Sequence, residues 1–370
     1  MDYSKAALEI SEKFQGKIDV VSKVSVNSKE DLSIAYTPGV AEPCRQIAKN
    51  PDCAYKYTIK GRTIAVVTDG SAVLGLGNIG PTAGLPVMEG KSLLFKEFAG
   101  VDAFPICLDT QDVDEIVKTV KYLAPGFGGI NLEDIAAPRC FEIEKKLQNE
   151  VDIPVFHDDQ HGTAIVVAAA VMNSFRLKKK DLKDVVAVIN GAGAAGTAIY
   201  QMLESIGIGE IRICDKEGLL KSVNPNTYPD KRISLQDSLV GADLFVGVSA
   251  PNLLKSCDIA KMNEKPVVFA MANPTPEIMP DEAKKGGAYI VGTGRSDFPN
   301  QINNVLVFPG FFKGLLQSRA KRVTKEMKLA AVQALANYIP ESELNTENII
   351  PDPLDKGVAK SVSEAVASQA

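Results

Sequence analysis

The chain has 370 residues, of which 45% are hydrophobic and 24% charged, so it is long enough to bury more than one core. Its formal net charge is −5, and its longest basic run is only Lys178-Lys179-Lys180. This balance argues against nucleic acid and anionic membranes as partners. The longest apolar run, residues 164–172, is far shorter than the roughly 20 residues that cross a bilayer, and it predicts a buried helix.

The N-terminal residues and the cysteines favour a cytoplasmic protein. Charged side chains such as Lys5 and Glu9 interrupt every early apolar cluster, so we expect no signal-peptide core. The cysteines show no C-x-x-C spacing, which argues against a disulfide framework and a thiolate metal site. We expect them to be reduced and mostly in the core. They stand at positions 44, 53, 107, 140, 214 and 257.

From about residue 62 the chain alternates β-rich runs with helical segments, which predicts an α/β protein with parallel sheets. The strands expected in the first half are residues 63–67, 103–108, 128–132 and 154–156. Acids follow each of these runs: Asp69, Asp109, Glu133-Asp134 and Asp158-Asp159. An acid after a strand often only caps the next helix, but open α/β sheets also bind ligands at this edge. The two doublets favour ligand binding.

The two acid doublets, with no cysteine nearby, predict an oxygen-rich site for a hard cation, Mg²⁺ or Mn²⁺. A competing interpretation is a zinc site at His157 and His161, which are four residues apart, as helical zinc ligands are. We reject it because residues 154–156 have the pattern of a strand and the glutamate of an H-E-x-x-H motif is absent.

The second half begins with a continuous apolar strand at 185–190 that leads into Gly191-Ala192-Gly193-Ala194-Ala195-Gly196. A helical pattern, a strand at 211–214 and then Asp215 follow. This is the context of a dinucleotide-binding turn: Gly191 for the tight turn, Gly193 for the approach of the pyrophosphate, Gly196 for close packing and Asp215 for the ribose. The other strands expected in this sheet are 244–248, 267–270 and 289–291.

A second glycine motif, residues 75–80, is not expected to bind the nucleotide. It lacks an adjoining apolar strand and leads into Pro81, Gly84 and Pro86, a sequence that does not predict a helix. Beyond residue 310 the chain is expected to be helical, with an amphipathic segment at 327–335. Residues 356–370 are expected to form a surface helix or a frayed end.

A dinucleotide beside a hard divalent cation indicates oxidation of a 2-hydroxy acid whose oxygens chelate the metal. The same cation would stabilise the enolate formed when a β-carboxylate leaves as CO₂. Oxidative decarboxylation therefore fits this combination of sites. The reaction also needs a base for the hydroxyl proton and an acid that protonates the carbon, and the residue pattern does not identify either group.

Eight motifs in the same order resemble the malic enzyme family, over residues 20 to 330. They are residues 35–41, 67–70, 74–80, 89–91, 132–134, 156–164, 272–275 and 301–310. The resemblance implies an N-terminal substrate and metal domain (1–160), a Rossmann-type NAD(P)-binding domain (161–300) and a C-terminal helical segment (301–370). It implies conversion of (S)-malate to pyruvate and CO₂ with NAD or NADP and Mg²⁺ or Mn²⁺, in a homodimer or larger homo-oligomer.

The resemblance also implies individual roles. Metal ligands would be Glu133, Asp134 and Asp159, with Asp158 as a partner behind them; Lys91 would be the base and Tyr36 the acid. Asn273, Asn303 and Asn304 would face malate and nicotinamide, and the cofactor would contact Gly191, Gly193, Ala194, Ala195, Gly196, Asp215, Asn273 and Asn303. By the residue pattern alone, Tyr36 is typical of a turn and Lys91 of a solvated helix. A lysine base near neutral pH also requires a lowered pKa, which burial is expected to provide.

The chain departs from the family at one position. Larger members place an arginine for a malate carboxylate two residues after the glycine that matches Gly70, whereas this chain has Ser71-Ala72. The choice between NAD and NADP is open, because Asp215 suits a free 2′-hydroxyl while Lys216 or Lys221 could neutralise a 2′-phosphate.

Two alternative functions remain at this point. One is a lyase of the same fold, which would decarboxylate oxaloacetate or convert malate directly to lactate. The other is a non-catalytic dinucleotide-binding regulator, which would need neither the acid doublets nor Tyr36 and Lys91.

Overall fold

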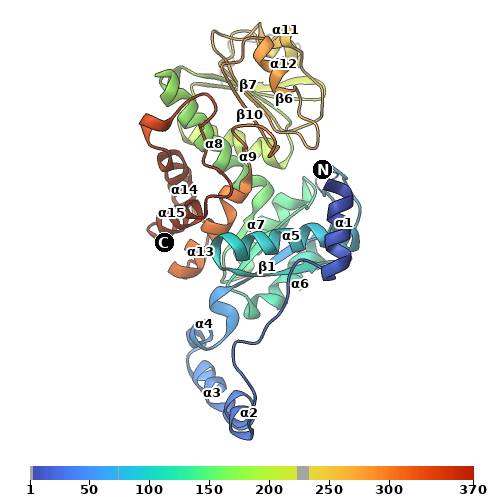
Figure 1. Cartoon of the computed structure of the whole chain (residues 1–370), viewed down its shortest axis with the longest axis vertical. Coiled ribbons are helices and arrows are strands. Elements are labelled where there is room, and N and C mark those ends of the chain that lie inside the picture. Colours follow the sequence, from blue (N-terminus) through green and yellow to red (C-terminus); the bar gives the residue numbers. More distant parts are fainter. Residues whose placement is uncertain (1–2, 74, 223–232) are drawn as a thin grey trace.

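The computed structural model describes residues 3–73, 75–222 and 233–370. Two sheets, one from each half of the chain, lie one beyond the other along the long axis, and an N-terminal arm projects from the end of the first half (Figure 1). Within the described residues, no helix is both long and apolar enough to cross a membrane.

The first sheet has four parallel strands in the order β2-β1-β3-β4. Each strand was predicted to within one residue. Every residue of β1 is buried, as expected for a central strand that is covered on both faces. The strands are β1 (Thr63–Thr68), β2 (Asp102–Cys107), β3 (Gly129–Leu132) and β4 (Val155–His157). The helices of this half are α5 (Pro81–Ala99), α6 (Val113–Leu123), η3 (Ala124–Gly126) and α7 (Arg139–Glu150).

The second sheet has the order β10-β9-β8-β5-β6-β7, and only β7 is antiparallel to its neighbour. The strands that follow β5 in the chain lie on both sides of it: β6 and β7 on one side, and β8, β9 and β10 on the other. This change of side makes it a doubly wound sheet, the kind that binds dinucleotides. The strands are β5 (Val186–Asn190), β6 (Glu210–Asp215), β7 (Gly218–Ser222), β8 (Leu244–Gly247), β9 (Val267–Ala270) and β10 (Ile290–Thr293). Its helices are η4 (Leu182–Asp184), α9 (Ala194–Ser205), α10 (Leu235–Ser238), α11 (Ser256–Ile259) and α12 (Pro280–Lys285).

Helix α8 (Asp158–Lys178) connects the two halves, and most of its residues are buried (Figure 1). It contains the apolar run 164–172, so the prediction of a buried helix is confirmed. It packs against α9 of the second half and against α14 of the C-terminal segment. The segment comprises η6 (Asn304–Leu306), α13 (Phe308–Ser318), α14 (Lys325–Tyr338), η7 (Glu341–Glu343) and α15 (Lys356–Ala367).

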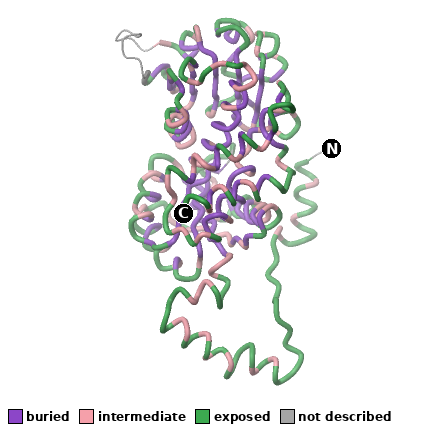
Figure 2. Tube along the Cα trace, turned by 90° about the vertical axis from the view of Figure 1, so that its left-hand side faces the viewer, coloured by how far each residue is buried: buried purple, intermediate pink, exposed green. Residues whose placement is uncertain are grey.

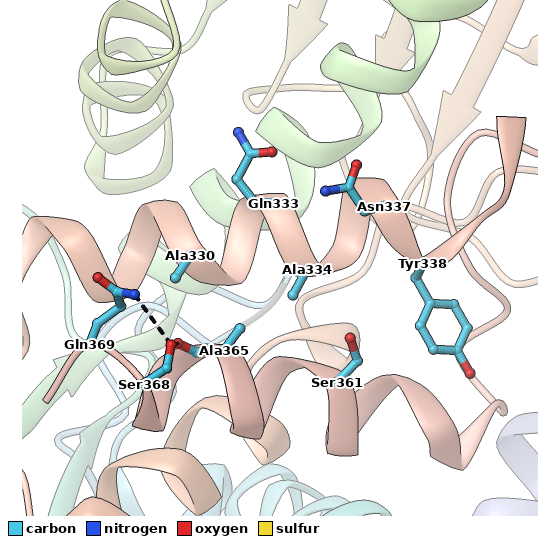
Figure 3. A pocket seen from close by; sticks show the side chains of 9 residues that line it. All are labelled: Ala330, Gln333, Ala334, Asn337, Tyr338, Ser361, Ala365, Ser368 and Gln369. Atoms are coloured by element: carbon cyan, nitrogen blue, oxygen red, sulfur yellow. Dashed lines mark hydrogen bonds between the residues drawn. The ribbon is translucent and has the colours of Figure 1, made fainter.

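The C-terminal segment returns to the first half, where α13 and α15 pack against α5. Aromatic rings hold this contact, because the centroid of the Phe308 ring lies 4.6 Å from that of Phe95, and Phe311 lies 4.6 Å from Phe156. Helices α14 and α15 lie side by side, and small side chains such as Ala334 and Ser361 line the outer groove between them (Figure 3).

One helix prediction is wrong. Residues after the 75–80 motif do form a helix, α5, because Pro81 occupies its first position, where a backbone N–H has no partner to lose. The prediction of a surface helix for residues 356–370 is confirmed over Lys356–Ala367. Helix α15 exposes side chains such as Lys360 and Glu364 and buries a stripe of apolar side chains spaced four residues apart, at Val358, Val362 and Val366.

Two further expectations need correction. Strand β7 was not predicted, because it is a five-residue edge strand whose pairing with β6 includes a register shift, so its apolar pattern is short. The cysteines are all free, but only Cys140 and Cys214 are buried, whereas Cys44 and Cys257 are exposed. The expectation that most of them lie in the core is therefore wrong.

The N-terminal region differs from the rest of the chain, because none of residues 3–62 is buried (Figure 2). After α1, the chain is fixed to α5 where the Lys17 backbone N–H donates to a Glu89 carboxylate oxygen over 3.0 Å. We call residues 18–58 the arm. The helices of the region are α1 (Tyr3–Phe14), α2 (Lys29–Ala35), α3 (Ala41–Lys49), η1 (Pro51–Cys53), α4 (Ala54–Tyr57) and η2 (Ile59–Arg62).

Candidate active site

The acid doublets meet at the carboxyl edge of the first sheet. Glu133 and Asp134 follow β3, Asp158 and Asp159 follow β4, and the two strands pair in parallel. One carboxylate oxygen from each of Glu133, Asp134 and Asp159 lies within 4.8 Å of the other two. The three residues predicted as metal ligands are therefore brought together, and all their donor atoms are oxygen, which Mg²⁺ and Mn²⁺ prefer.

The turn that carries Asp134 is held by its backbone. Asp134 has a φ of +53°, and its N–H donates to a carboxylate oxygen of Asp159 over 2.9 Å. The Ala72 N–H donates to the Asp134 carbonyl over 2.9 Å, and the Ser71 hydroxyl accepts the Ala136 N–H over 2.9 Å. Ser71 and Ala72 therefore fix the acidic turn.

The electrostatics of the cluster favour a cation. Burial raises the pKa of Glu133, and burial together with the charges of Asp159 and Glu133 raises the pKa of Asp134 to about 8. One carboxylate oxygen of Asp134, Oδ2, is buried and has no hydrogen-bond partner within the described part of the chain. A divalent cation would supply the missing partner and offset the repulsion, so these residues fit Mg²⁺ or Mn²⁺.

Lys91 lies in the same cluster, with 7% of its surface exposed. Its ammonium contacts a carboxylate oxygen of Asp158, lies 3.0 Å from Glu133 Oε1 and sits 3.9 Å from the centroid of the Phe308 ring. The residue pattern alone, which indicated a solvated lysine, is therefore misleading. Burial lowers the pKa of Lys91, but the Asp158 and Glu133 carboxylates outweigh it and raise the pKa, so the expected lowering is not found in this state.

Asp158 is fully buried and links three elements. Besides Lys91 of α5, it accepts a hydrogen bond of 2.5 Å from the side-chain amide of Asn304 in η6. Gly162 lies one helical turn further along α8, where a Cβ would stand 1.9 Å from Asp158 Oδ1. A glycine is therefore required beside this carboxylate. Asn304, predicted to face substrate, here holds the partner of the lysine.

Several predicted residues lie outside the cluster. Asp69 is buried but pairs with the Arg139 guanidinium at 2.9 Å, and Asp109 is exposed. Tyr36 is the C-cap of α2 on the arm and is 67% exposed, and α2 lies far from α5 (Figure 1). Within a single chain, the proposed acid and base are therefore not brought together.

The histidines do not form a zinc site. His157 ends β4 and is the N-cap of α8, as the strand pattern predicted. The His161 ring lies 2.9 Å from a carboxylate oxygen of Glu144, and burial lowers the pKa of His157 to about 4. Among the described residues, the cluster of metal-type ligands consists of carboxylates alone.

The dinucleotide-binding turn has the predicted geometry. Gly191 follows β5 with a φ of +116°, and a Cβ on Gly196 would stand 1.6 Å from its carbonyl oxygen. Gly193 is the N-cap of α9, and a Cβ there would have no heavy atom within 4 Å among the described residues. Because Gly193 borders open space at a helix N-terminus, a pyrophosphate can approach the backbone N–H groups of Ala194 and Ala195.

A cavity of about 460 Å³ extends from this turn, and both Gly191 and Asp215 line it, together with Lys216. Asp215 ends β6, as predicted. The side chain of Lys221, the other candidate for a 2′-phosphate, lies outside what the structure describes. The cavity therefore joins the residues that were predicted to bind pyrophosphate and ribose.

The remaining asparagines lie between the halves. Asn273 follows β9 and is half-buried, and a Cβ on Gly75 would stand 3.2 Å from its carbonyl oxygen. The rejected glycine motif therefore contributes to the contact between the first and second halves. The Asn303 side chain accepts the Val305 N–H over 2.9 Å and caps η6, which positions Asn304.

Sequence reasoning missed two supporting residues. Asn131, a polar residue inside the buried strand β3, donates to a carboxylate oxygen of Glu133 over 2.8 Å, and its position in an apolar strand was a usable signal. Glu277 is fully buried and accepts N–H groups from Ser249 at 2.9 Å and Ala272 at 3.1 Å, which ties together the ends of β8 and β9. No sequence pattern indicated Glu277.

Comparisons with known proteins give the same result across the whole chain. The family model described as "Malic enzyme, N-terminal domain" matches residues 15–148, and "Malic enzyme, NAD binding domain" matches 160–224 and 224–370. The bifunctional malic/malolactic enzyme of Bacillus subtilis (strain 168) is 53% identical over 100% of this chain and 93% of its own length.

Two further comparisons agree. The NAD-dependent malic enzyme of Geobacillus stearothermophilus is 54% identical, over 96% of this chain and 77% of its own length. The crystal structure of the NAD-dependent malic enzyme of Thermotoga maritima superposes with a TM-score of 0.92 at 48% identity and covers 98% of each chain.

Proposed function

The chain belongs to the malic enzyme family and catalyses the oxidative decarboxylation of malate with NAD(P), and we propose that Glu133, Asp134 and Asp159 hold the Mg²⁺ or Mn²⁺ that this reaction uses. The observation that carries the proposal is the convergence of three carboxylate oxygens within 4.8 Å beside a buried lysine. The bound cation would act as a Lewis acid on the substrate oxygen and would lower the pKa of nearby groups.

We assign the base to Lys91. The neutral amine of Lys91 would take the C2 hydroxyl proton of malate, and a bound nicotinamide would accept the hydride from C2, which would give oxaloacetate. Asp158 and Asn304 hold the amine in place, because Asp158 contacts both residues and is itself buried. The Phe308 ring against the ammonium keeps water from this side of the lysine. The Asp158 and Glu133 carboxylates raise the pKa of Lys91, and a cation bound by the cluster would oppose this effect.

We assign the acid to Tyr36. Cleavage of the bond between C3 and the β-carboxylate releases CO₂ and leaves the electron pair on the enolate of pyruvate. The phenolic O–H then donates its proton to C3, which gives pyruvate, and the tyrosine recovers a proton from solvent or from Lys91. This role depends on the family match at residues 35–41.

For the cofactor, we propose that the pyrophosphate binds at Gly193 and the N-terminus of α9 and that the ribose binds at Asp215. The cavity lined by Gly191 and Asp215 supports this placement. Asn273 and Asn303 would face the nicotinamide and malate from the second half. We also propose domain bounds of 1–160, 161–300 and 301–370, which the start of α8 at Asp158 supports.

The metal assignment is tested with Asp159→Asn and with Asp109→Asn as the control, an exposed acid after β2. Asp159→Asn is expected to weaken Mn²⁺ binding, measured by calorimetry, and to abolish nearly all malate-dependent reduction of the cofactor. Asp109→Asn should behave as wild type. Wild-type Mn²⁺ affinity in a folded Asp159→Asn protein would remove this residue from the ligand set.

A malolactic reaction is a second candidate, which the 53% identity to a bifunctional malic/malolactic enzyme supports. It would follow if pyruvate stayed bound and took the hydride back from the reduced cofactor to give lactate. Formation of lactate from malate without accumulation of free reduced cofactor would establish it, and formation of pyruvate alone would exclude it.

A further inference from the structure

The first turn of α8 carries two carboxylates of the acid cluster, so the position of this turn sets the positions of Asp158 and Asp159. The helix begins after its N-cap His157, whose side chain makes no hydrogen bond to the turn. Both ring nitrogens of His157 are buried and have no hydrogen-bond partner within the described part of the chain. The N-cap side chain, which fixes the start of many helices, therefore does not fix this one.

A carboxylate from another helix holds the turn instead. Glu144 lies in α7, which packs against β4, and only 6% of its surface is exposed. Its Oε1 accepts the His157 backbone N–H over 3.1 Å. The His161 Nε2 lies 2.9 Å from Oε1 and 3.0 Å from Oε2, and because an ionised carboxylate only accepts, this ring nitrogen is the donor. Glu144 thus grips the chain on both sides of the acid doublet.

The surroundings of Glu144 keep it ionised. Burial raises its pKa, but His161 and His157 outweigh burial and lower the pKa. Burial also lowers the pKa of Lys328 in α14, and the Glu144 charge partly opposes that effect, so these two charges interact. A buried, ionised carboxylate that receives hydrogen bonds from two groups holds its partners in a fixed geometry.

Asp159 depends on this arrangement more than Asp158 does. The Asp158 carboxylate has side-chain partners of its own in Lys91 and Asn304. Within the described residues, the Asp159 carboxylate accepts a hydrogen bond from one group, the Asp134 N–H, over 2.9 Å. The direction in which Asp159 points is therefore set mainly by the backbone of the first turn of α8.

We propose that Glu144 is a positioning residue of the metal site. By holding the His157 backbone and the His161 ring, it fixes the turn between them and points the Asp159 carboxylate into the cluster of metal ligands. The inference rests on the proposed metal site. Glu144 contacts neither the other metal ligands nor Lys91 through a hydrogen bond in the described chain, so it acts through the turn alone.

The test is the Mn²⁺ affinity of Glu144→Leu, measured by calorimetry on the full chain. Leucine fills much of the same volume but cannot accept either hydrogen bond. Removal of a group that orients a metal ligand typically costs about 10–100-fold in metal affinity, and we expect a loss of this size. The affinity for reduced cofactor, measured by fluorescence, should stay unchanged, because the dinucleotide-binding turn belongs to the other half of the chain. Wild-type Mn²⁺ affinity in a folded Glu144→Leu protein would overturn the proposal.

The conservative variant Glu144→Gln should restore most of the Mn²⁺ affinity. Its amide oxygen can still accept the His157 N–H, which is the contact that fixes the backbone. A Glu144→Gln protein that bound Mn²⁺ as weakly as Glu144→Leu would overturn positioning through the backbone.

Leu147→Ala is the control for a merely structural role of α7. Leu147 is fully buried on the same helix, so its truncation should lower the melting temperature while leaving the Mn²⁺ affinity of the folded protein unchanged. Equal losses of affinity in Leu147→Ala and Glu144→Leu would show that any loosening of α7 disturbs the site, and the specific role of Glu144 would be overturned.

A second variant keeps the proposal testable if Glu144→Leu does not fold. His161→Phe retains a ring beside Phe156, at 5.4 Å between centroids in the wild type, but removes the nitrogen that donates to Glu144. With one of the two contacts left, we expect a smaller loss of Mn²⁺ affinity and an altered electron paramagnetic resonance spectrum of the bound Mn²⁺. Wild-type affinity together with an unchanged spectrum would overturn the proposal.

Asp159→Asn separates failure of this inference from failure of the proposed metal site. If Asp159→Asn weakens Mn²⁺ binding while Glu144→Leu does not, the metal site stands and the positioning role falls. If Asp159→Asn binds Mn²⁺ with wild-type affinity, the proposed site fails and the positioning role fails with it. Losses in both variants, with recovery in Glu144→Gln, are the expected result.

Discussion

The dinucleotide-binding turn and the acid cluster place polar groups at sheet edges by different means. The turn uses six consecutive residues, and its demands are steric: Gly196 must lack a side chain to pack, and Gly193 borders open space. The acid cluster instead gathers side chains from the ends of β3 and β4, from α5 and from η6. A site built from consecutive residues, such as the turn, can be recognised from a short motif. A site built from distant segments, such as the acid cluster, depends on the whole fold.

The two regions also differ in their tolerance of change. At the turn, backbone N–H groups at a helix N-terminus carry the binding, so a substitution should weaken affinity for the cofactor in a graded way. In the acid cluster, buried charges depend on one another, and loss of one leaves the others uncompensated. We therefore expect larger effects on kcat from the cluster than on KM from the turn.

The largest effect should come from Lys91→Ala. Loss of a general base is expected to lower kcat for malate oxidation by about 10²–10⁴-fold, since Lys91 supplies the amine that pairs with Glu133 and Asp158 of the acid cluster. Single-turnover reduction of the cofactor measures this step directly. Lys96→Ala, on the same helix with an exposed side chain, is the control and should retain the wild-type rate. A Lys91→Ala enzyme that oxidised malate at a normal rate would place the base elsewhere.

The next largest effect should come from Gly162→Ala, at a residue that is not proposed to contact the substrate. Its Cβ would stand 1.9 Å from Asp158 Oδ1, so Asp158 must move and Lys91 with it. Because misplacement of catalytic groups by about 1 Å can cost roughly 10²-fold, kcat should fall by that order while the cofactor KM stays constant. Gly126→Ala, at an exposed glycine with open space around it, is the matched control. Equal kcat values for the two variants would show that Asp158 does not position the lysine.

Much of this architecture could be predicted from the sequence. All four strands of the first sheet were placed to within one residue, because buried parallel strands are nearly continuous apolar runs. The meeting of the Glu133 and Asp159 segments followed from parallel topology alone, since carboxyl ends of neighbouring strands share one edge. The nucleotide-binding turn was equally accessible, because strand, glycines, helix and Asp215 are consecutive in the chain.

The rest depended on contacts between distant segments. Lys91 has the pattern of a solvated helix residue until α13 brings Phe308 against it. Asn304 meets Asp158 only because the C-terminal segment returns to the first half, and the sequence separation of 146 residues hides the pair. For α15 a surface helix was predicted, but its packing against α13 and α14 could not be read from its composition. For Tyr36, only the family resemblance indicated a role, because a single chain leaves it exposed.

A smaller effect is expected at the dinucleotide turn from Gly193→Val. The branched side chain would fill the open space where the pyrophosphate approaches, at a φ of −79° that valine accepts, so the fold should survive. Loss of one charge-assisted hydrogen bond, worth about 1.5–3 kcal/mol, corresponds to a rise of roughly 10–100-fold in the cofactor KM. Steady-state kinetics with saturating malate measure it, with Gln201→Val on the exposed face of α9 as the control. An unchanged KM would move the pyrophosphate away from this glycine.

The smallest effect should come from Glu277→Gln, behind the turn. The two carboxylate oxygens of Glu277 accept the Ser249 and Ala272 N–H groups. A glutamine side chain has only one oxygen, so one of these two hydrogen bonds is lost. The free energy of unfolding should therefore fall by about 1 kcal/mol. Burial raises the pKa of Glu277, so the folded state holds its proton more tightly than the unfolded state.

The sign of the pH dependence follows from that shift. The stability contributed by the bound proton is fully present below the ordinary carboxyl pKa, and it is lost as the pH rises through the raised value. Glutamine has no such titration, so the stability difference between wild type and Glu277→Gln should narrow from acidic to neutral pH in urea denaturation. Because Glu277 touches neither substrate nor metal ligands, kcat should stay near the wild-type value. A difference that widened from acidic to neutral pH would mean that the backbone N–H groups outweigh burial and lower the pKa of Glu277, and a difference that did not vary would mean that folding leaves this pKa unchanged.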